Sequence, residues 1–212
     1  MLQLRLEKAR NLLFLGAHSD DIEIGCGGTI LKLAGANPKL NILWVVFSAD
    51  GKRRREARSS AALFLKGVSR SRVVVKQFRT SFFPVEQDSI KSYFETLRKS
   101  FEPDIVFTHY REDRHQDHRL LSDLAWNTFR DHMILEYEIP KYDGDLGCPN
   151  LFVPLEPAVA RRKTKSLQQA FVSQGDKHWF SEETFLGLMR LRGMECASRY
   201  AEGFYCRKMV CG

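Results

Sequence analysis

Hydrophobic and polar positions divide the chain into two alternating kinds of segment. Short, nearly continuous apolar runs are typical of strands buried on both faces, and they occur at 11–17, 40–48, 73–78, 104–109, 133–139 and roughly 204–210. Apolar residues at helical spacing fill the stretches at 22–34, 53–66, 87–100, 116–130, about 157–174 and 181–197. This alternation predicts an α/β fold: a single Rossmann-like domain over residues 1–212, with a mostly parallel sheet and helices on both faces. In such folds the active site lies at the carboxyl ends of the strands.

Ionisable residues gather where the first predicted strand ends. His18, Asp20, Asp21 and Glu23 lie within six residues of one another. An aspartate that caps the following helix explains one of these acids, but it does not explain a histidine and two adjacent acids. A neutral imidazole and a carboxylate together suit zinc and similar divalent ions. We therefore favour a metal site over a helix cap.

A second polar cluster follows the fourth predicted strand. It holds His109, His115 and His118, and the last two are three residues apart, so they share a face of a helical turn. By itself this cluster fits a solvated, charged loop equally well. If the first and fourth strands are neighbours in the sheet, however, a histidine and a carboxylate from the first cluster meet a histidine from the second. Three protein ligands and an open position for water are the arrangement of catalytic zinc sites.

Both clusters resemble motifs of the LmbE-like (PIG-L) N-acetylglucosaminyl deacetylases. Residues 18–23 resemble the family's HPDDxE motif, and residues 115–118 resemble its HxDH motif. The resemblance covers most of the chain, including residues 25–29, the start of the helix near residue 53 and residues 200–204. Ser19 replaces the usual proline, and Tyr110 follows His109 where the family often has His-Pro. We expect metal binding to survive the first change and the pocket rim to be altered by the second.

The resemblance implies a role for each residue that matches a motif. The metal ligands are His18, Asp21 and His118, with Zn²⁺ expected and other divalent ions left open. The catalytic residues are Asp20 as general base, His115 as oxyanion stabiliser and proton donor to the leaving amine, and Asp117 as the residue that orients His115. The candidate substrate-binding residues are Arg53, whose place Arg54 or Arg55 could take, Glu23 and His109.

The function implied by these roles is metal-dependent removal of an N-acetyl group from an N-acetylglucosamine-type sugar or sugar conjugate. Amides resist hydrolysis because water is a weak nucleophile and an amine is a poor leaving group. A metal lowers the pKa of water and polarises the carbonyl, so that Asp20 needs to accept only one proton. The sequence does not identify the substrate, and sugars that carry phosphate remain among the candidates.

The charge of the chain leaves other functions open. Among 212 residues, 33 lysines and arginines outnumber 26 acids, giving a net charge of +7. Basic clusters at 52–55 and 161–165 suit a non-catalytic module that binds nucleic acid or another anion, although solvated helix starts explain them more simply. Residues 25–28 suggest a nucleotide-binding Rossmann enzyme, but their spacing is not G-x-G-x-x-G. Non-haem iron oxygenases also use two histidines and a carboxylate, typically on antiparallel barrels rather than α/β folds.

The remaining features concern the cellular setting. Five scattered cysteines, with no C-x-x-C pair, are typical of free thiols in a reducing compartment. No apolar stretch reaches about 18–20 residues, and residues 1–16 do not resemble a signal peptide. We expect a cytoplasmic protein with a small-molecule substrate, no nucleic-acid partner and no transmembrane segment, and homo-oligomers are left open.

Overall fold

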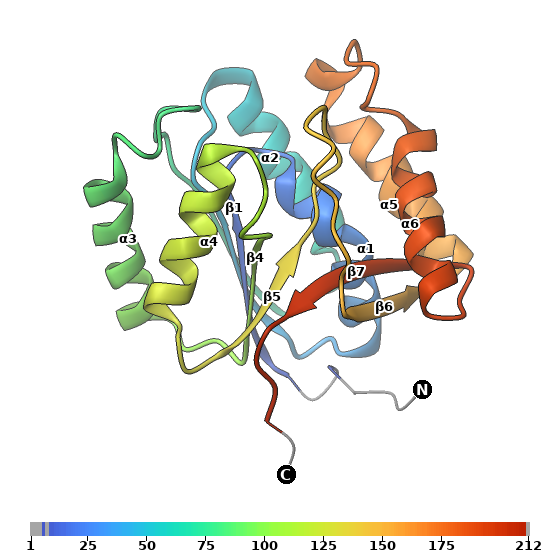
Figure 1. Cartoon of the computed structure of the whole chain (residues 1–212), viewed down its shortest axis with the longest axis horizontal. Coiled ribbons are helices and arrows are strands. Elements are labelled where there is room, and N and C mark those ends of the chain that lie inside the picture. Colours follow the sequence, from blue (N-terminus) through green and yellow to red (C-terminus); the bar gives the residue numbers. More distant parts are fainter. Residues whose placement is uncertain (1–5, 7–8, 211–212) are drawn as a thin grey trace.

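Seven strands form one sheet in the order β3-β2-β1-β4-β5-β7-β6 (Figure 1). The structure is a computed structural model that describes Leu6 and residues 9–210. The strands are β1 (Asn11–Gly16), β2 (Asn41–Val46), β3 (Arg70–Val75), β4 (Ile105–His109), β5 (Met133–Tyr137), β6 (Leu151–Leu155) and β7 (Tyr200–Cys206). The helices are α1 (Asp21–Ala36), α2 (Gly51–Phe64), α3 (Gln87–Ser100), α4 (Gln116–Thr128), α5 (Pro157–Ala170) and α6 (Glu182–Glu195), and the short 3₁₀ helix η2 is Val172–Gln174.

The parallel part of the sheet contains a point at which the strand order reverses. Strands β3, β2, β1, β4 and β5 run parallel, with β2 and β4 on either side of β1. The chain therefore leaves β1 on one side and later returns to the other side, which is the position where open α/β sheets bind ligands. The predicted α/β class and mostly parallel sheet are confirmed.

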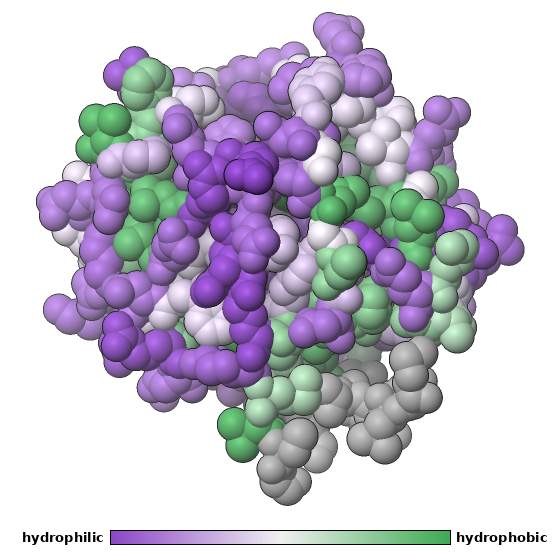
Figure 2. Space-filling view, in the orientation of Figure 1, coloured by the Kyte–Doolittle hydropathy of each residue, from purple (hydrophilic) through white to green (hydrophobic). Residues whose placement is uncertain are grey.

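Helices cover both faces of the sheet, as the pattern predicts (Figure 1). Along β1, Leu12 and Phe14 join the core that includes residues of α1, α2, α5 and α6, whereas Leu13 and Leu15 join the core under α3 and α4. Successive side chains of a strand point to opposite faces, so a continuous apolar run supplies two cores at once. The face of the molecule that Figure 2 shows is largely hydrophilic, with smaller hydrophobic patches.

The glycines after the first motif allow α1 to lie close to the sheet. A Cβ added to Gly25 would lie 2.1 Å from the Tyr137 ring, and one added to Gly28 would lie 2.4 Å from Leu155 Cδ1. Tyr137 reaches across from β5 and donates a hydrogen bond to the Leu15 carbonyl (2.6 Å). The glycines thus serve helix–sheet packing, and this packing fixes the start of α1 against the ends of β1 and β5.

The antiparallel edge of the sheet differs from the prediction. Strand β6 was not predicted, and it contains Pro154, which removes a backbone donor and is tolerated at an edge. Strand β7 covers Tyr200–Cys206 rather than 204–210. The charged Glu202 interrupts the apolar pattern of this buried strand, so the sequence does not indicate where the strand begins. Glu202 is paired with Lys163 at 2.6 Å and accepts hydrogen bonds from the Gly28 and Thr29 N–H groups. Strand β3 begins three residues earlier than expected, with exposed polar residues, because it forms the other edge.

Two further expectations meet the limits of the described residues. Residues 1–5, 7–8 and 211–212 lie outside them, so most of the charged N-terminal stretch and Cys211 are not described. The four described cysteines are free thiols. Within the described residues, no helix is both long enough and apolar enough to cross a bilayer.

Candidate functional site

The turn between β1 and α1 places three polar side chains at the carboxyl edge of the sheet. The His18 N–H donates a hydrogen bond to Asp21 Oδ2 (2.6 Å), which closes the turn on the first residue of α1. Asp20 precedes the helix, but its side chain makes no capping bond. The Asp20 carboxylate instead meets the Arg53 guanidinium, with Oδ1 2.9 Å from Nη2. The helix-cap interpretation of the acids therefore fails for Asp20.

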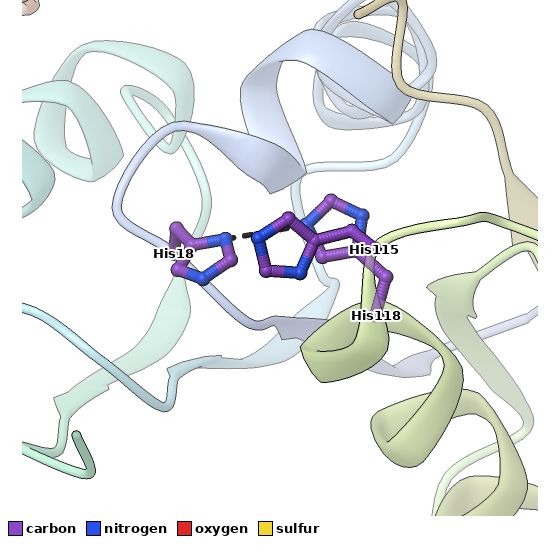
Figure 3. Close-up of side chains that lie close together, drawn as sticks. All are labelled: His18, His115 and His118. Carbon is purple, nitrogen blue, oxygen red and sulfur yellow. Dashed lines mark hydrogen bonds between the residues drawn. The ribbon is translucent and has the colours of Figure 1, made fainter. Parts of the chain in front are cut away.

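The loop after β4 brings the second cluster to the same place. Strand β4 pairs directly with β1, with Phe107 opposite Phe14. His118 lies in the first turn of α4, and its Nε2 is 3.2 Å from His18 Nδ1. Figure 3 shows His18 on one side and His115 and His118 on the other, converging from these two loops. The two motifs, almost a hundred residues apart in sequence, form one site.

Three atoms of this site have the spacing of ligands on a single metal ion. His18 Nδ1, Asp21 Oδ2 and His118 Nε2 are separated by 3.2, 3.4 and 3.5 Å. Ligand atoms about 2.0–2.1 Å from a tetrahedral zinc ion lie about 3.3 Å apart. Two imidazoles and one carboxylate are also a donor set that zinc accepts. The residues present therefore fit a divalent metal ion with an open coordination position.

The charges around these atoms favour a bound cation. Burial lowers the pKa of His18, but Asp21 and Asp117 outweigh it and raise that pKa to about 10. Burial, with the neighbouring imidazole of His109, lowers the pKa of His118 to about 3, which favours the neutral imidazole that a metal needs. Burial would raise the pKa of Asp21, but the imidazoles of His118, His109 and His18 hold it well below its ordinary range. Anionic Asp21 and neutral His118 are the protonation states in which these groups bind metals, whereas His18 must give up a proton to a bound cation.

A carboxylate contacts the outer nitrogen of each candidate histidine ligand. Asp117 Oδ2 lies 3.1 Å from His18 Nε2, and Asp113 Oδ2 lies 2.9 Å from His118 Nδ1. Carboxylates in this position fix the orientation of an imidazole and strengthen it as a ligand. The sequence reasoning missed Asp113, which lies in a run of charged residues typical of a solvated loop. Asp113 precedes His115 by two residues and accepts its backbone N–H (2.7 Å). The sequence shows this spacing, but the contact itself becomes apparent only in the folded loop.

The predicted link from Asp117 to His115 differs in the structure. The Asp117 carboxylate contacts His18 and accepts the backbone N–H groups of Ser81 (2.6 Å) and Phe83 (3.1 Å). His115 Nδ1 accepts a hydrogen bond from the Asp117 backbone N–H (3.2 Å), because His115 caps α4. A capping Nδ1 leaves the proton of a neutral imidazole on Nε2. His115 can therefore donate a hydrogen bond in its neutral form, which suits a pKa that burial and His18 lower.

A polar cavity of about 620 Å³ opens beside His18. Residues that line it come from the ends of β1 and β2, the start of α2, the segment after β3 and the connection after α5, among them Ser19, Ser48, Arg53, Thr80 and Gln174. Of the three arginines that the sequence left open, the one that lines this cavity is Arg53. Its Nη1 also contacts Glu56 Oε2 (3.2 Å), so two carboxylates hold it in place.

Two predicted substrate-binding residues are buried instead. The Glu23 side chain is 0% exposed on the inner face of α1, where burial raises its pKa well above the ordinary range. His109 is also 0% exposed; its Nε2 accepts a hydrogen bond from the Ala17 N–H (3.0 Å) and lies 3.3 Å from Asp21 Oδ2. Strand and helix packing cover both side chains. His109 thus lies behind Asp21, and neither Glu23 nor His109 lines the cavity.

Comparison with known proteins places these observations in a family. The model of the PIG-L family, described as GlcNAc-PI de-N-acetylase, matches residues 13–129. YaiS, an uncharacterized deacetylase of Escherichia coli (strain K12), is 29% identical over 149 residues, which make up 63% of this chain and 76% of YaiS.

Solved structures share the fold across nearly the whole chain. The N,N'-diacetylchitobiose deacetylase from Pyrococcus horikoshii has a TM-score of 0.74 and 24% identity, covering 97% of this chain and 86% of its own. GalB, the 4-carboxy-2-hydroxymuconate hydratase from Pseudomonas putida KT2440, has a TM-score of 0.75 and 18% identity, covering 96% and 98%. The family match contains both motif loops that build the site, and on this basis the chain belongs to the PIG-L family.

Proposed function

We propose that this protein is a zinc-dependent N-deacetylase that acts on an N-acetylglucosamine-type sugar or sugar conjugate, including one that carries phosphate. The observation that carries the proposal is the triangle of His18 Nδ1, Asp21 Oδ2 and His118 Nε2, with sides of 3.2–3.5 Å, beside an open polar cavity. Membership of the PIG-L family and the similarity to YaiS support the choice of an acetylated amide as substrate.

The residues around the triangle have the chemistry that amide hydrolysis needs. A divalent ion bound there would supply Lewis acidity, lowering the pKa of water and polarising the carbonyl. Asp20 then accepts one proton; burial raises the pKa of its carboxyl, and the contact with Arg53 opposes that rise. His115 offers an Nε2–H donor to the oxygen that gains negative charge. The proton that Asp20 collects is available for the departing amine, either from Asp20 or through His115.

The fold alone does not choose between hydrolysis and hydration, because a hydratase shares it. Both reactions need water activation, and the two motif loops would serve either one. The family model favours hydrolysis, since its description is of a de-N-acetylase.

The test is acetate release across a panel of N-acetylated sugars, nucleotide sugars, phosphate-bearing sugars and sugar conjugates. Each substrate is assayed with the zinc-loaded protein, with protein treated with a chelator, and with chelated protein reloaded with zinc. We expect acetate from at least one substrate, loss of that activity on chelation and recovery with zinc. Absence of acetate from every substrate, with zinc bound, would overturn the proposal.

A further inference from the structure

The loop Glu138–Gly147, which follows β5, makes a contact that reaches the metal site from outside the two motifs. Its tip is exposed, with Tyr142 74% accessible and Gly144 in the left-handed backbone region at φ +60°. The residues on either side of the tip turn inward. Lys141 Nζ lies between two carboxylates, 2.9 Å from Asp113 Oδ2 and 2.6 Å from Asp145 Oδ2.

These contacts form a continuous chain from the loop to a metal ligand. Asp113 Oδ2 receives both Lys141 Nζ and His118 Nδ1, at 2.9 Å each, while Asp113 Oδ1 accepts the His115 N–H. Asp145 closes the chain from the other side by accepting the Arg114 N–H (2.6 Å). The loop after β4 and the loop after β5 are therefore joined by charged hydrogen bonds directly behind His118.

Burial makes the lysine important for Asp113. The Asp113 side chain is 2% exposed and that of Lys141 is 12% exposed, so water compensates little of their charge. A buried carboxylate without a cation pays a large desolvation cost, which it can reduce by rotating toward other partners. Rotation would remove the acceptor that fixes the His118 ring, and partners of this kind typically change metal affinity by about 10–100-fold.

We propose that Lys141 is a positioning residue for the metal site, acting through Asp113 on His118, and that it couples the loop Glu138–Gly147 to metal binding. The inference rests on the proposed function only in taking His118 as a metal ligand. Coupling between two events is reciprocal. Metal binding therefore stabilises the loop conformation in which Lys141 contacts Asp113 by the same factor by which that conformation improves metal affinity.

The first test measures zinc affinity by competition with a chromophoric chelator. The variant Lys141→Met keeps an unbranched side chain and loses the charge, and we expect it to weaken zinc binding about tenfold. Lys91→Met is the matched control: Lys91 is likewise held by hydrogen bonds, to Glu95, Asn127 and Thr128, but it joins α3 to the end of α4 away from the proposed metal site. It should leave zinc affinity unchanged even if it lowers thermal stability.

A double-mutant cycle tests whether Lys141 acts through Asp113. In an Asp113→Asn background, Lys141→Met should have no further effect on zinc affinity, because the intermediate carboxylate is already gone. Equal zinc affinity of Lys141→Met and wild type would overturn the proposal. So would an undiminished effect in the Asp113→Asn background, since the lysine would then act at a distance through its charge alone.

The second readout follows the loop itself. Chymotrypsin cleavage after the exposed Tyr142 should be slowed by zinc in the wild type and should no longer respond to zinc in Lys141→Met. Cleavage that is insensitive to zinc in the wild type would contradict the coupling. Failure of the metal site itself is separate: it would appear as zinc binding that survives His118→Ala, whereas failure of this inference leaves that binding lost and the Lys141 variant unaffected.

Discussion

The two loops that meet at the site divide the work unequally. The turn after β1 is short and almost wholly buried, and it supplies two of the proposed metal ligands, His18 and Asp21, together with the proposed base Asp20. The loop after β4 is longer and partly exposed. With the first turn of α4 it supplies one proposed ligand, His118, while the carboxylates of Asp113 and Asp117 contact the histidines rather than the open side of the site.

This difference indicates that the carboxylates of the second loop orient the histidines, including His18 of the first loop. Asp117 crosses over to hold His18 of the other loop, so the loops support each other. Changes in the first loop should therefore remove the chemistry, and changes in the carboxylates of the second should loosen the metal.

Asp20→Asn should have the largest effect on activity. The asparagine side chain cannot take a proton from water, so kcat should fall by about 10²–10⁴-fold. Zinc content should stay at the wild-type level, because Asp20 is not one of the proposed ligands. Steady-state acetate release and metal analysis on the same sample check this. Asp123→Asn on the exposed side of α4 serves as the control and should keep full activity. An Asp20→Asn enzyme that is metal-replete and fully active would refute the role of Asp20.

Asp117→Asn should act mainly on the metal. It removes the charged partner of His18 Nε2 and places an amide where two backbone N–H groups now find carboxylate oxygens. We expect zinc affinity to weaken by about 10–100-fold, with a kcat at saturating zinc that falls less than in Asp20→Asn. The opposite pattern, unchanged zinc affinity and a kcat as low as that of Asp20→Asn, would favour the direct link to His115 that the sequence suggested.

Gly25→Ala should test how tightly the start of α1 is held. The new Cβ would lie 2.1 Å from the Tyr137 ring, so we expect the free energy of unfolding to fall by about 1–3 kcal/mol. Gly35→Ala in the last turn of the same helix meets nothing within 4 Å and should instead raise it by about 0.5–1 kcal/mol. Urea unfolding of both variants measures the contrast, and equal behaviour would show that α1 does not depend on close approach to the sheet.

Glu56→Gln should give the smallest effect, and one that depends on pH. Burial would raise the pKa of Glu56, but hydrogen bonds from Ser173 and the contact with Arg53 outweigh it and lower that pKa. A carboxyl with a lowered pKa in the folded state contributes stability above its unfolded pKa, about 4.3, and loses it as the pH falls further. The variant should therefore be about 1 kcal/mol less stable than wild type at pH 7, with the gap closing below about pH 4.

Exposed Glu102→Gln is the control for this pH dependence and should stay within about 0.5 kcal/mol of wild type throughout. A gap for Glu56→Gln that persists at low pH would show that the ionised carboxylate is not what stabilises the contact with Ser173.

The sequence predicts the parallel sheet well because buried strands such as Asn41–Val46 are nearly continuous apolar runs, which are a local signal. The proposed metal ligands come from the resemblance to family motifs, which are also local stretches of sequence. The misses depend on partners distant in sequence. Glu202 makes the start of β7 look polar, because its partner Lys163 is distant in sequence. Asp113 looks like an ordinary loop residue, because its contacts with Lys141 and His118 form only in the fold. Glu23 and His109 look available to a substrate because burial is not visible in a motif.

The most direct test of the proposed metal site compares the zinc content of the wild type with that of His118→Ala. Zinc is measured by elemental mass spectrometry after chelation, reloading and removal of free metal. We predict about one zinc ion per chain in the wild type and almost none in the variant, with circular dichroism showing that both proteins are folded. Equal zinc content in the two proteins, or no zinc retained by the wild type, would contradict the claim that His18, Asp21 and His118 form a metal site.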